Sequence, residues 1–213
     1  MLKIKKIFQP GTSVQEAENF FFTHKEAHKI AHTNWSNFPY KPDVSFKIGH
    51  SGTEIYLQFQ VKEKYIRAKY KHDNDPVWTD SCVEFFFSPV PDGTYYNIEF
   101  NCIGTTLIGF GKGKQDRRRA DIEVTSKIER NSSLGNDTIE SSEGDFSWTL
   151  TLVIPVAAFH KHEITNLSGL AAKGNFYKCG DEVKEAHYLS WKPISFERPN
   201  FHLPDFFGEL AFE

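Results

Sequence analysis

The fold of this chain is decided by two neighbouring stretches, CVEFFF (residues 82–87) and YYNIEFNC (residues 95–102), which a turn at 89–93 connects. Both stretches are rich in the β-branched and aromatic residues that strands favour, and the turn carries an Asp-Gly pair typical of β-hairpins. Side chains two positions apart in a strand share a face. One face of the hairpin is therefore apolar, and we expect its members to be buried: Val83, Phe85, Phe87, Tyr96, Ile98, Phe100 and Cys102.

The opposite face of the same hairpin is polar. It carries Glu84 on the first strand, and Asn97, Glu99 and Asn101 on the second. Burying an unpaired polar group costs about 2–7 kcal/mol, so these groups must be solvated, bonded to one another or directed at a ligand. We expect Glu84 and Glu99 to lie close across the hairpin, where their repulsion requires a cation or a donor between them. Arg67, on a preceding predicted strand, is the candidate cation.

Most of the remaining chain also reads as short strands. Residues 55–61, for example, alternate strictly between apolar and polar side chains. The further predicted strands are 44–48, 65–70, 105–110, 122–128, 147–154, 174–181, 186–191 and 207–212. Short strands separated by frequent turns, without alternating long helices, are typical of sandwiches and barrels. We therefore predict an all-β fold in which residues 1–213 form one domain, a single β-sandwich.

Three other segments have different signatures. Ser13 and Glu16 form a capping-box pattern, which predicts the short N-terminal helix over residues 13–31. Residues 131–144 are rich in Ser, Asn, Asp and Gly and are predicted to be a mobile surface loop. The basic run 117–119 lies between two aspartates, and we interpret it as part of a solvated loop.

The composition excludes several classes of protein. Among the 213 residues are 20 Phe, 8 Tyr and 4 Trp, more rings than a core of this size needs, which leaves some for a surface role. A net charge of −3 argues against nucleic acid as a partner. No apolar run approaches the roughly 18 residues that span a bilayer, so a membrane partner is not expected either. The composition indicates no particular oligomeric state.

The first residues and the cysteines bear on the compartment. Residues 1–10 contain no apolar stretch and no small-residue cleavage site, so we expect a cytoplasmic protein, or a periplasmic or secreted one whose signal was removed. Cys82, Cys102 and Cys179 form no Cys-x-x-Cys pair, which argues against a zinc knot or a redox motif. We interpret them as small buried hydrophobic side chains.

Two loops offer aromatic rings for a ligand. Trp78 stands in the polar loop 75–81, where its flat face can stack on the C–H face of a sugar while neighbouring polar groups contact the hydroxyls. The Pro-stiffened loop 196–208 supplies Phe201 and His202 as candidates for a second ring opposing Trp78.

The same residues leave two other functions open, and calcium is the one cofactor that the sequence suggests. Glu84 and Glu99 form a carboxylate pair of the kind that a glycoside hydrolase uses as acid and as base or nucleophile. Aromatic loops on a β-sandwich also suit the docking of a protein partner. Asp73, Asp75 and Asp80 offer carboxylates for calcium, although no EF-hand loop is present.

Several of these motifs resemble those of family 9 carbohydrate-binding modules. The stretch WTDSCVEFF (78–86) is similar to the W-x-D-D/S-x-V-E-hydrophobic strand of these modules, and residues 97–104 and 207–210 resemble the strands that follow it. The stretches NFYKCGD (175–181), SWKPI (190–194) and PNFH (199–202) are similar to family-9-like proteins of gut Bacteroidetes. The resemblance covers the chain from about Trp35 to its end.

The resemblance implies a jelly-roll-like β-sandwich that binds sugar between aromatic rings, with calcium in some members. Such modules are usually attached to secreted hydrolases of polysaccharides, among them xylanases. By position, Trp78 matches one of the two sandwiching tryptophans, Glu84 an acceptor for a sugar hydroxyl, and Asn101 a polar contact. Glu99 stands where the xylan-associated modules carry an arginine.

The resemblance gives no clear counterpart of the second tryptophan, so Phe201 or His202 must replace it. We therefore predict non-catalytic binding of a poly- or oligosaccharide, with xylan- or cellulose-type chain ends as candidate ligands. The predicted sugar-binding residues are Trp78, Glu84, Asn97, Glu99, Asn101, Arg67, Phe201 and His202.

Overall fold

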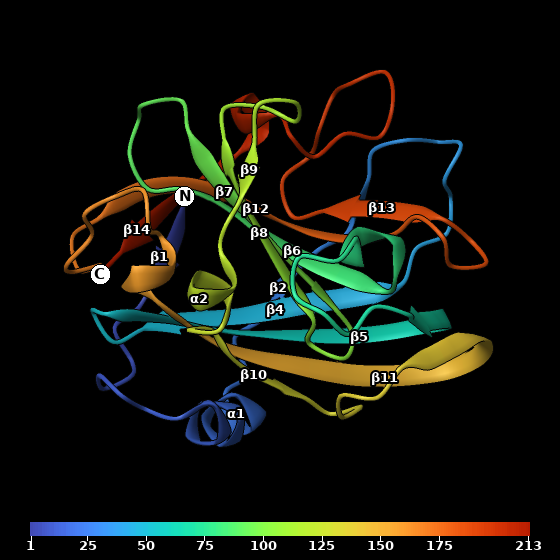
Figure 1. Ribbon diagram of the computed structural model, residues 1–213, viewed down its shortest axis with the longest axis horizontal. Coiled ribbons are helices and arrows are strands. Elements are labelled where there is room, and N and C mark those ends of the chain that lie inside the picture. The colour runs from blue at the N-terminus through green and yellow to red at the C-terminus, as the bar shows by residue number, and fades with distance from the viewer.

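The computed structural model describes residues 1–213 as two β-sheets packed face to face (Figure 1). Sheet A has the order β1 (Leu2–Ile4), β14 (Gly208–Phe212), β12 (Ala171–Gly180), β6 (Cys82–Ser88), β7 (Tyr95–Asn101), β8 (Thr106–Gly111) and β9 (Arg118–Arg119), and β13 (His187–Ser190) and β3 (His32–Thr33) extend it beside β12. Sheet B has the order β10 (Glu129–Ser132), β11 (Ile139–Pro155), β5 (Glu54–Ala68), β4 (Asp43–His50) and β2 (His28–Lys29). The predicted all-β sandwich is confirmed.

The core between the sheets is built on the apolar face of the predicted hairpin. β6 and β7 pair antiparallel, and the apolar side chains listed for this face are all buried. Phe85 stacks on Phe176 of β12 with ring centroids 4.7 Å apart, and Phe176 stacks on Phe46 of β4 at 3.8 Å. Because these three rings come from both sheets, their stacking joins the two layers, and such pairs add about 0.5–1.5 kcal/mol beyond the burial of apolar area.

The N-terminal helix α1 (Val14–Thr23) lies on the outer face of sheet B, where Figure 1 shows it below β10 and β11. The predicted capping box is present: Glu16 N donates to the Ser13 hydroxyl at 3.3 Å, and Ser13 N donates to the Glu16 carboxylate at 2.9 Å. Phe21 anchors the helix in a small apolar cluster with Tyr56 of β5.

The helix is shorter than residues 13–31. It ends at Thr23 because the chain becomes extended at His24 (φ −78°, ψ 124°). Beyond that point His28 pairs with Phe46 as part of β2, so the backbone hydrogen bonds of this segment go to sheet B rather than into a longer helix.

Two predictions about sheet B were wrong in extent. β5 runs unbroken to Ala68 and takes in most of the separate strand predicted at 65–70. β11 begins at Ile139, inside the segment 131–144 that was predicted to be a loop, and β10 occupies residues 129–132. The first part of β11 pairs with the far end of β5 across two register shifts, while its side chains face solvent. Its polar composition therefore reflects an exposed strand.

The strand predicted at 122–128 is instead a short helix, α2 (Ile122–Thr125), followed by a turn. Thr125 and Ile128 are buried, whereas Ile122 is 56% exposed. Buried positions three apart fit one helical turn and conflict with the alternation of a strand. The other helical segments are the single turns η1 (Val77–Thr79), η2 (Val156–Ala158) and η3 (Pro204–Phe206), and none of the helices is long and apolar enough to cross a bilayer.

A second apolar cluster covers part of the outer face of sheet A. Trp35, Phe201 and Phe207 reach it from loops and pack with Phe86 and Tyr177 of the sheet. These loops cover the sheet only in part. The uncovered area beside them, over β6, β7 and β8, holds the polar face of the hairpin.

Candidate functional site

A cleft of about 300 Å³ opens on the outer face of sheet A. Its floor crosses four neighbouring strands and consists of Cys179 of β12, Glu84 of β6, Asn97 and Glu99 of β7, and Leu107 and Gly109 of β8. Its walls are formed by Trp78 of η1, Asp181 after β12, Tyr188 of β13, residues 199–202 of the C-terminal loop, and the basic residues Lys114, Arg117, Arg118 and Arg119.

Glu84 and Glu99 are paired on this floor, as the sequence predicted. They are Cα partners in the antiparallel pair of β6 and β7, and they are 3% and 4% exposed. Burial raises the pKa of both carboxyls, and the charge of Glu99 raises the pKa of Glu84 further. A hydrogen bond from Asn97 and the charge of Arg117 act in the opposite direction on the pKa of Glu99. The pair therefore favours a proton on Glu84 and the negative charge on Glu99.

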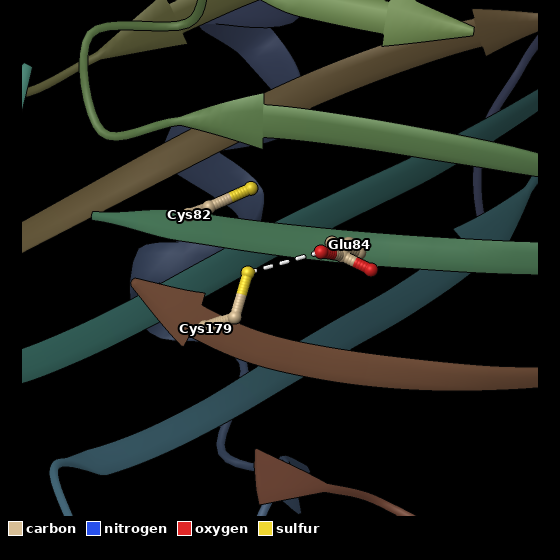
Figure 2. Close-up of side chains that lie close together, drawn as sticks. All are labelled: Cys82, Glu84 and Cys179. Carbon is tan, nitrogen blue, oxygen red and sulfur yellow. Dashed lines mark hydrogen bonds between the residues drawn. The ribbon is translucent and has the colours of Figure 1, made fainter. Parts of the chain in front are cut away.

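A thiol holds Glu84 from the side of β12. Figure 2 shows Cys82 and Glu84 on one strand and Cys179 on its neighbour, with the Cys179 thiol donating to Glu84 Oε1 at 3.0 Å. The ligand atoms of the three side chains lie within 4.8 Å of one another, a donor set that a thiophilic metal accepts. Burial raises the pKa of Cys82 to about 12, which favours protonated thiols here. All three cysteines are buried and unbridged, as expected, but Cys179 is more than a hydrophobic side chain, because it lines the cleft and donates to Glu84.

Asn97 is positioned by its neighbour on β8. Its Nδ2 donates to Glu99 Oε1 at 2.7 Å, while its Oδ1 has no hydrogen-bond partner. Gly109 is paired with Asn97 across the two strands, and a Cβ at that position would collide with Asn97 Oδ1. Glu99 Oε2 also lacks a partner. The floor thus contains two acceptor atoms that the protein itself does not use.

Two half-buried rings line the walls. Trp78 lines the cleft from η1 and also packs against the apolar cluster on this face of the sheet. Tyr188 is the second ring, and it lies on the same sheet face as Cys179, its partner in the pairing of β12 with β13.

The two residues predicted to supply the second ring also line the cleft, but both are engaged elsewhere. Phe201 is 8% exposed because it stacks on Tyr177 with centroids 4.1 Å apart. His202 Nδ1 is hydrogen-bonded to the Tyr95 hydroxyl at 3.0 Å. Burial, with the charges of Arg117 and Lys114, lowers the pKa of His202 to about 2, so this wall residue is neutral.

Arg67 and Asn101 do not line the cleft, and Arg67 does not lie between the two glutamates. Both converge on the buried carboxylate of Asp80: Arg67 Nε lies 3.6 Å from Oδ1, and Asn101 Nδ2 donates to Oδ2 at 3.0 Å. Asn101 Oδ1 accepts from Thr105 N at 2.9 Å, and Arg67 also pairs with Glu182. Their hydrogen-bonding groups are thus used to hold strands together.

The basic run is not simply a solvated loop. Arg118 and Arg119 form β9, the edge strand of sheet A, and Arg117 is half-buried over the cleft. Arg117 Nε and Nη1 are buried without a hydrogen-bond partner. The positive charge that lowers the pKa of both glutamates thus comes from Arg117 in this segment and not from Arg67.

The carboxylates proposed for calcium do not form one cluster. Asp73 accepts two hydrogen bonds from Arg130, at 2.7 and 3.0 Å. Asp75 accepts from His72 N at 3.3 Å, and Asp80 is held by the contacts described above. Each of these acids is bonded to protein donors, and the only group of three ligating side chains with mutually close donor atoms is Cys82, Glu84 and Cys179.

Tyr188 and Arg117 are the functional candidates that the sequence did not reveal. The alternation of strand 186–191 places Tyr188 on the opposite face from the buried Leu189, and this was the available signal. Nothing in the basic run indicated that the loop after β8 returns over the sheet.

Comparison with known proteins agrees with this architecture. Residues 16–212 match the family described as carbohydrate-binding family 9. A candidate carbohydrate-binding protein from Bacteroides uniformis shares 44% sequence identity, with a TM-score of 0.95 over 100% of this chain and 98% of its own. Comparison with curated proteins finds no match.

Two more distant structures share the fold. They show a family 9 carbohydrate-binding module from Caldicellulosiruptor kristjanssonii in complex with glucose or cellotriose. Identity is 11% in both. The TM-scores are 0.60 and 0.61, over 99% and 100% of this chain and 95% and 93% of theirs.

Proposed function

Because this chain belongs to carbohydrate-binding family 9, we propose that the cleft on the outer face of sheet A binds a saccharide without cleaving it. The observation that carries the proposal is the meeting of aromatic rings with unused donors and acceptors in one open cleft. Recognition sites for small molecules combine apolar walls with a few polar groups that fix orientation.

The polar groups suit hydroxyls. A sugar hydroxyl both donates and accepts a hydrogen bond. It can therefore donate to Asn97 Oδ1 or Glu99 Oε2 and accept from Arg117 Nε or Nη1, which have no partner, once these side chains turn toward the cleft, since the four atoms are shielded from solvent in the unliganded protein. A buried polar atom without a partner costs about 1–3 kcal/mol, so a ligand that satisfies these atoms gains affinity by removing that cost.

The rings suit the C–H face of a sugar. Trp78 and Tyr188 are half-buried, so each is held by packing and still presents part of its surface to the cleft. Phe201 and His202 fill the wall beside them. We propose Trp78 as the principal stacking surface, and β-linked glucose or xylose oligosaccharides, including chain ends, as the ligands to test first.

The test is a calorimetric titration of these oligosaccharides into the parent and into Trp78→Ala. By analogy with the stacking of rings on bases, the loss of the indole should weaken binding by about 1–3 kcal/mol. Trp78→Phe should retain part of the affinity, and the control Phe196→Ala removes an exposed ring outside the cleft and should change nothing. Unchanged affinity of Trp78→Ala for every saccharide that the parent binds would contradict the assignment.

One observation favours hydrolysis as a second candidate, namely the raised pKa of Glu84 beside Glu99. A general acid needs such a shift. The two acids, however, lie side by side on one floor, whereas a glycosidase places its carboxyls on either side of the scissile bond. We expect no release of reducing sugar from a panel of polysaccharides. Turnover that is lost in Glu84→Gln would establish the enzyme instead.

A further inference from the structure

We propose that the preferred saccharide is anionic, and that the carboxylate of a hexuronate unit lies against the basic wall formed by Lys114, Arg117 and Arg118. This inference rests on the proposed function, because it specifies the class of ligand for the same cleft. It is argued from the ion pairing, the burial and the balance of charge at this wall.

The cations that line the cleft form no ion pair within the protein. Lys114, Arg117, Arg118 and Arg119 all line the cleft, and the ion pairs of the molecule include none of them. Asp116, the acid nearest in sequence, is used by the loop itself, since it accepts from Gly113 N at 2.8 Å. No acidic side chain pairs directly with these cations, although their charges act across the cleft on Glu84, Glu99 and Asp181, so their hydrogen-bonding groups are available to a ligand.

Arg117 is the central group of this wall. Its side chain is half-buried, two of its guanidinium nitrogens are shielded from solvent, and none of the three makes a hydrogen bond to the protein. By contrast, the half-buried Arg130 makes a two-fold hydrogen bond with Asp73. A guanidinium held away from water without an acceptor is best satisfied by a carboxylate, whose hydrogen bonds with arginine are about twice as strong as neutral ones.

The charge of the cleft is opposite in sign to that of the molecule. The whole chain has a net charge of −3, yet the cleft gathers four cationic side chains against three acidic ones, Glu84, Glu99 and Asp181. His202 adds no charge because it is neutral. The resulting field attracts an anion to a cleft whose floor still offers acceptors for hydroxyls.

A uronic acid can satisfy both the acceptors of the floor and the cations of the wall with a single sugar ring. Its hydroxyls can donate to Asn97 Oδ1 and Glu99 Oε2 on the floor, and its single carboxylate can accept from the basic wall. A neutral hexose leaves the wall unpaired. A sugar phosphate or sulfate offers the same sign of charge, so these compounds serve as comparison ligands in the test.

The experiment compares ligands that differ only at carbon 6. Methyl β-glucoside, methyl β-glucuronide, methyl β-glucoside 6-phosphate and methyl β-glucoside 6-sulfate are titrated into the full chain by calorimetry, at about 0.02 M and about 0.2 M salt. We expect the glucuronide to bind about tenfold more tightly than the glucoside at low salt. We also expect this ratio to fall at the higher salt concentration.

Variants of the basic wall test whether these side chains cause the preference for the glucuronide. Lys114 and Arg118 are exposed, so the double variant Lys114→Gln/Arg118→Gln should fold like the parent, which thermal unfolding checks. It should lose part of the preference for the glucuronide, and adding Arg117→Gln, which removes the central group of the wall, should remove the rest. The matched control is Lys112→Gln, an exposed cation of the same loop that lines a neighbouring hollow and not this cleft, and it should keep the preference.

The outcomes separate the two proposals. Equal binding of glucuronide and glucoside would overturn the anionic ligand and leave saccharide binding standing. Tighter binding of the phosphate or sulfate than of the glucuronide would overturn the uronate. A preference that survives when Arg117→Gln is added to Lys114→Gln/Arg118→Gln would overturn the role of the wall. No binding of any saccharide, including the neutral oligosaccharides named above, would overturn the proposed function itself.

Discussion

At Glu84, burial and the neighbouring Glu99 act on one carboxyl in the same direction, and this has a consequence for stability. Both raise its folded-state pKa above that of an exposed glutamate. The stability that comes from protonated Glu84 is therefore fully present below the pKa of the unfolded chain. It is lost as the pH rises through the folded pKa.

Glu84→Gln should accordingly stabilise the protein at pH 8 and have little effect near pH 4. The amide mimics the protonated acid and cannot ionise, and the gain is about 1.4 kcal/mol for each pH unit by which the folded pKa exceeds the unfolded one. Denaturant unfolding at the two pH values measures the difference. The control Glu140→Gln removes an exposed carboxylate outside the cleft and should show no such dependence. The same change in stability at both pH values would show that Glu84 is ordinarily ionised.

The residues that meet on the cleft floor could be predicted from the alternation of side chains along two strands. The period of two placed Glu84, Asn97 and Glu99 on one face, and the hairpin placed them side by side. The cation that lies over these carboxylates could not be predicted in the same way. Arg67 was a reasonable cation by its position in the chain, but its strand belongs to sheet B and its charge is used by Asp80.

At the scale of elements, Asp80 ties the end of β5 to η1 and β7. Its Oδ2 accepts from Lys69 N at 3.0 Å and from Tyr70 N at 3.2 Å, in addition to its contacts with Arg67 and Asn101. The resemblance marked this aspartate as part of a motif with Trp78, and the structure shows that its contacts hold the segment that carries the indole.

Asp80→Ala should lower the free energy of unfolding by about 3–5 kcal/mol, because it leaves the buried Arg67 with only the exposed Glu182 as an ionic partner and leaves the backbone amides of residues 69 and 70 without their acceptor. Asp80→Asn should cost less, since the amide retains an acceptor. The control Asp75→Ala removes a single contact to His72 N and should cost less than about 1 kcal/mol. Denaturant unfolding measures all three, and an equal, small loss for Asp80→Ala and Asp75→Ala would contradict the role of Asp80.

Element boundaries were predictable where a local signal exists and wrong where tertiary pairing decides. The capping box placed the start of α1 correctly. Its end, and the strand at the start of β11, depend on pairing with β4 and β5, which lie far away in the sequence. For such polar, two-sided segments the composition could not distinguish an exposed strand from a loop.

At the scale of the whole molecule, the cleft exists because loops distant in sequence meet over one sheet face. Its walls come from η1, from the loop that leads into β9, from β13 and from residues 199–202. The two termini lie close together on one side of the sandwich in Figure 1, where β1 pairs with β14. The sandwich class followed from the spacing of strands. The walls of the cleft could not be predicted from the sequence, because no periodic pattern indicates which loops fold back over the sheet.

The most direct test of the account is a crystal structure of the chain with the saccharide that binds it most tightly. We expect the sugar in the cleft over β6 and β7, with one ring on Trp78, hydroxyls at Asn97 and Glu99, and its anionic group at the basic wall. A well-ordered sugar bound elsewhere on the molecule, with this cleft empty, would contradict the assignment of the site.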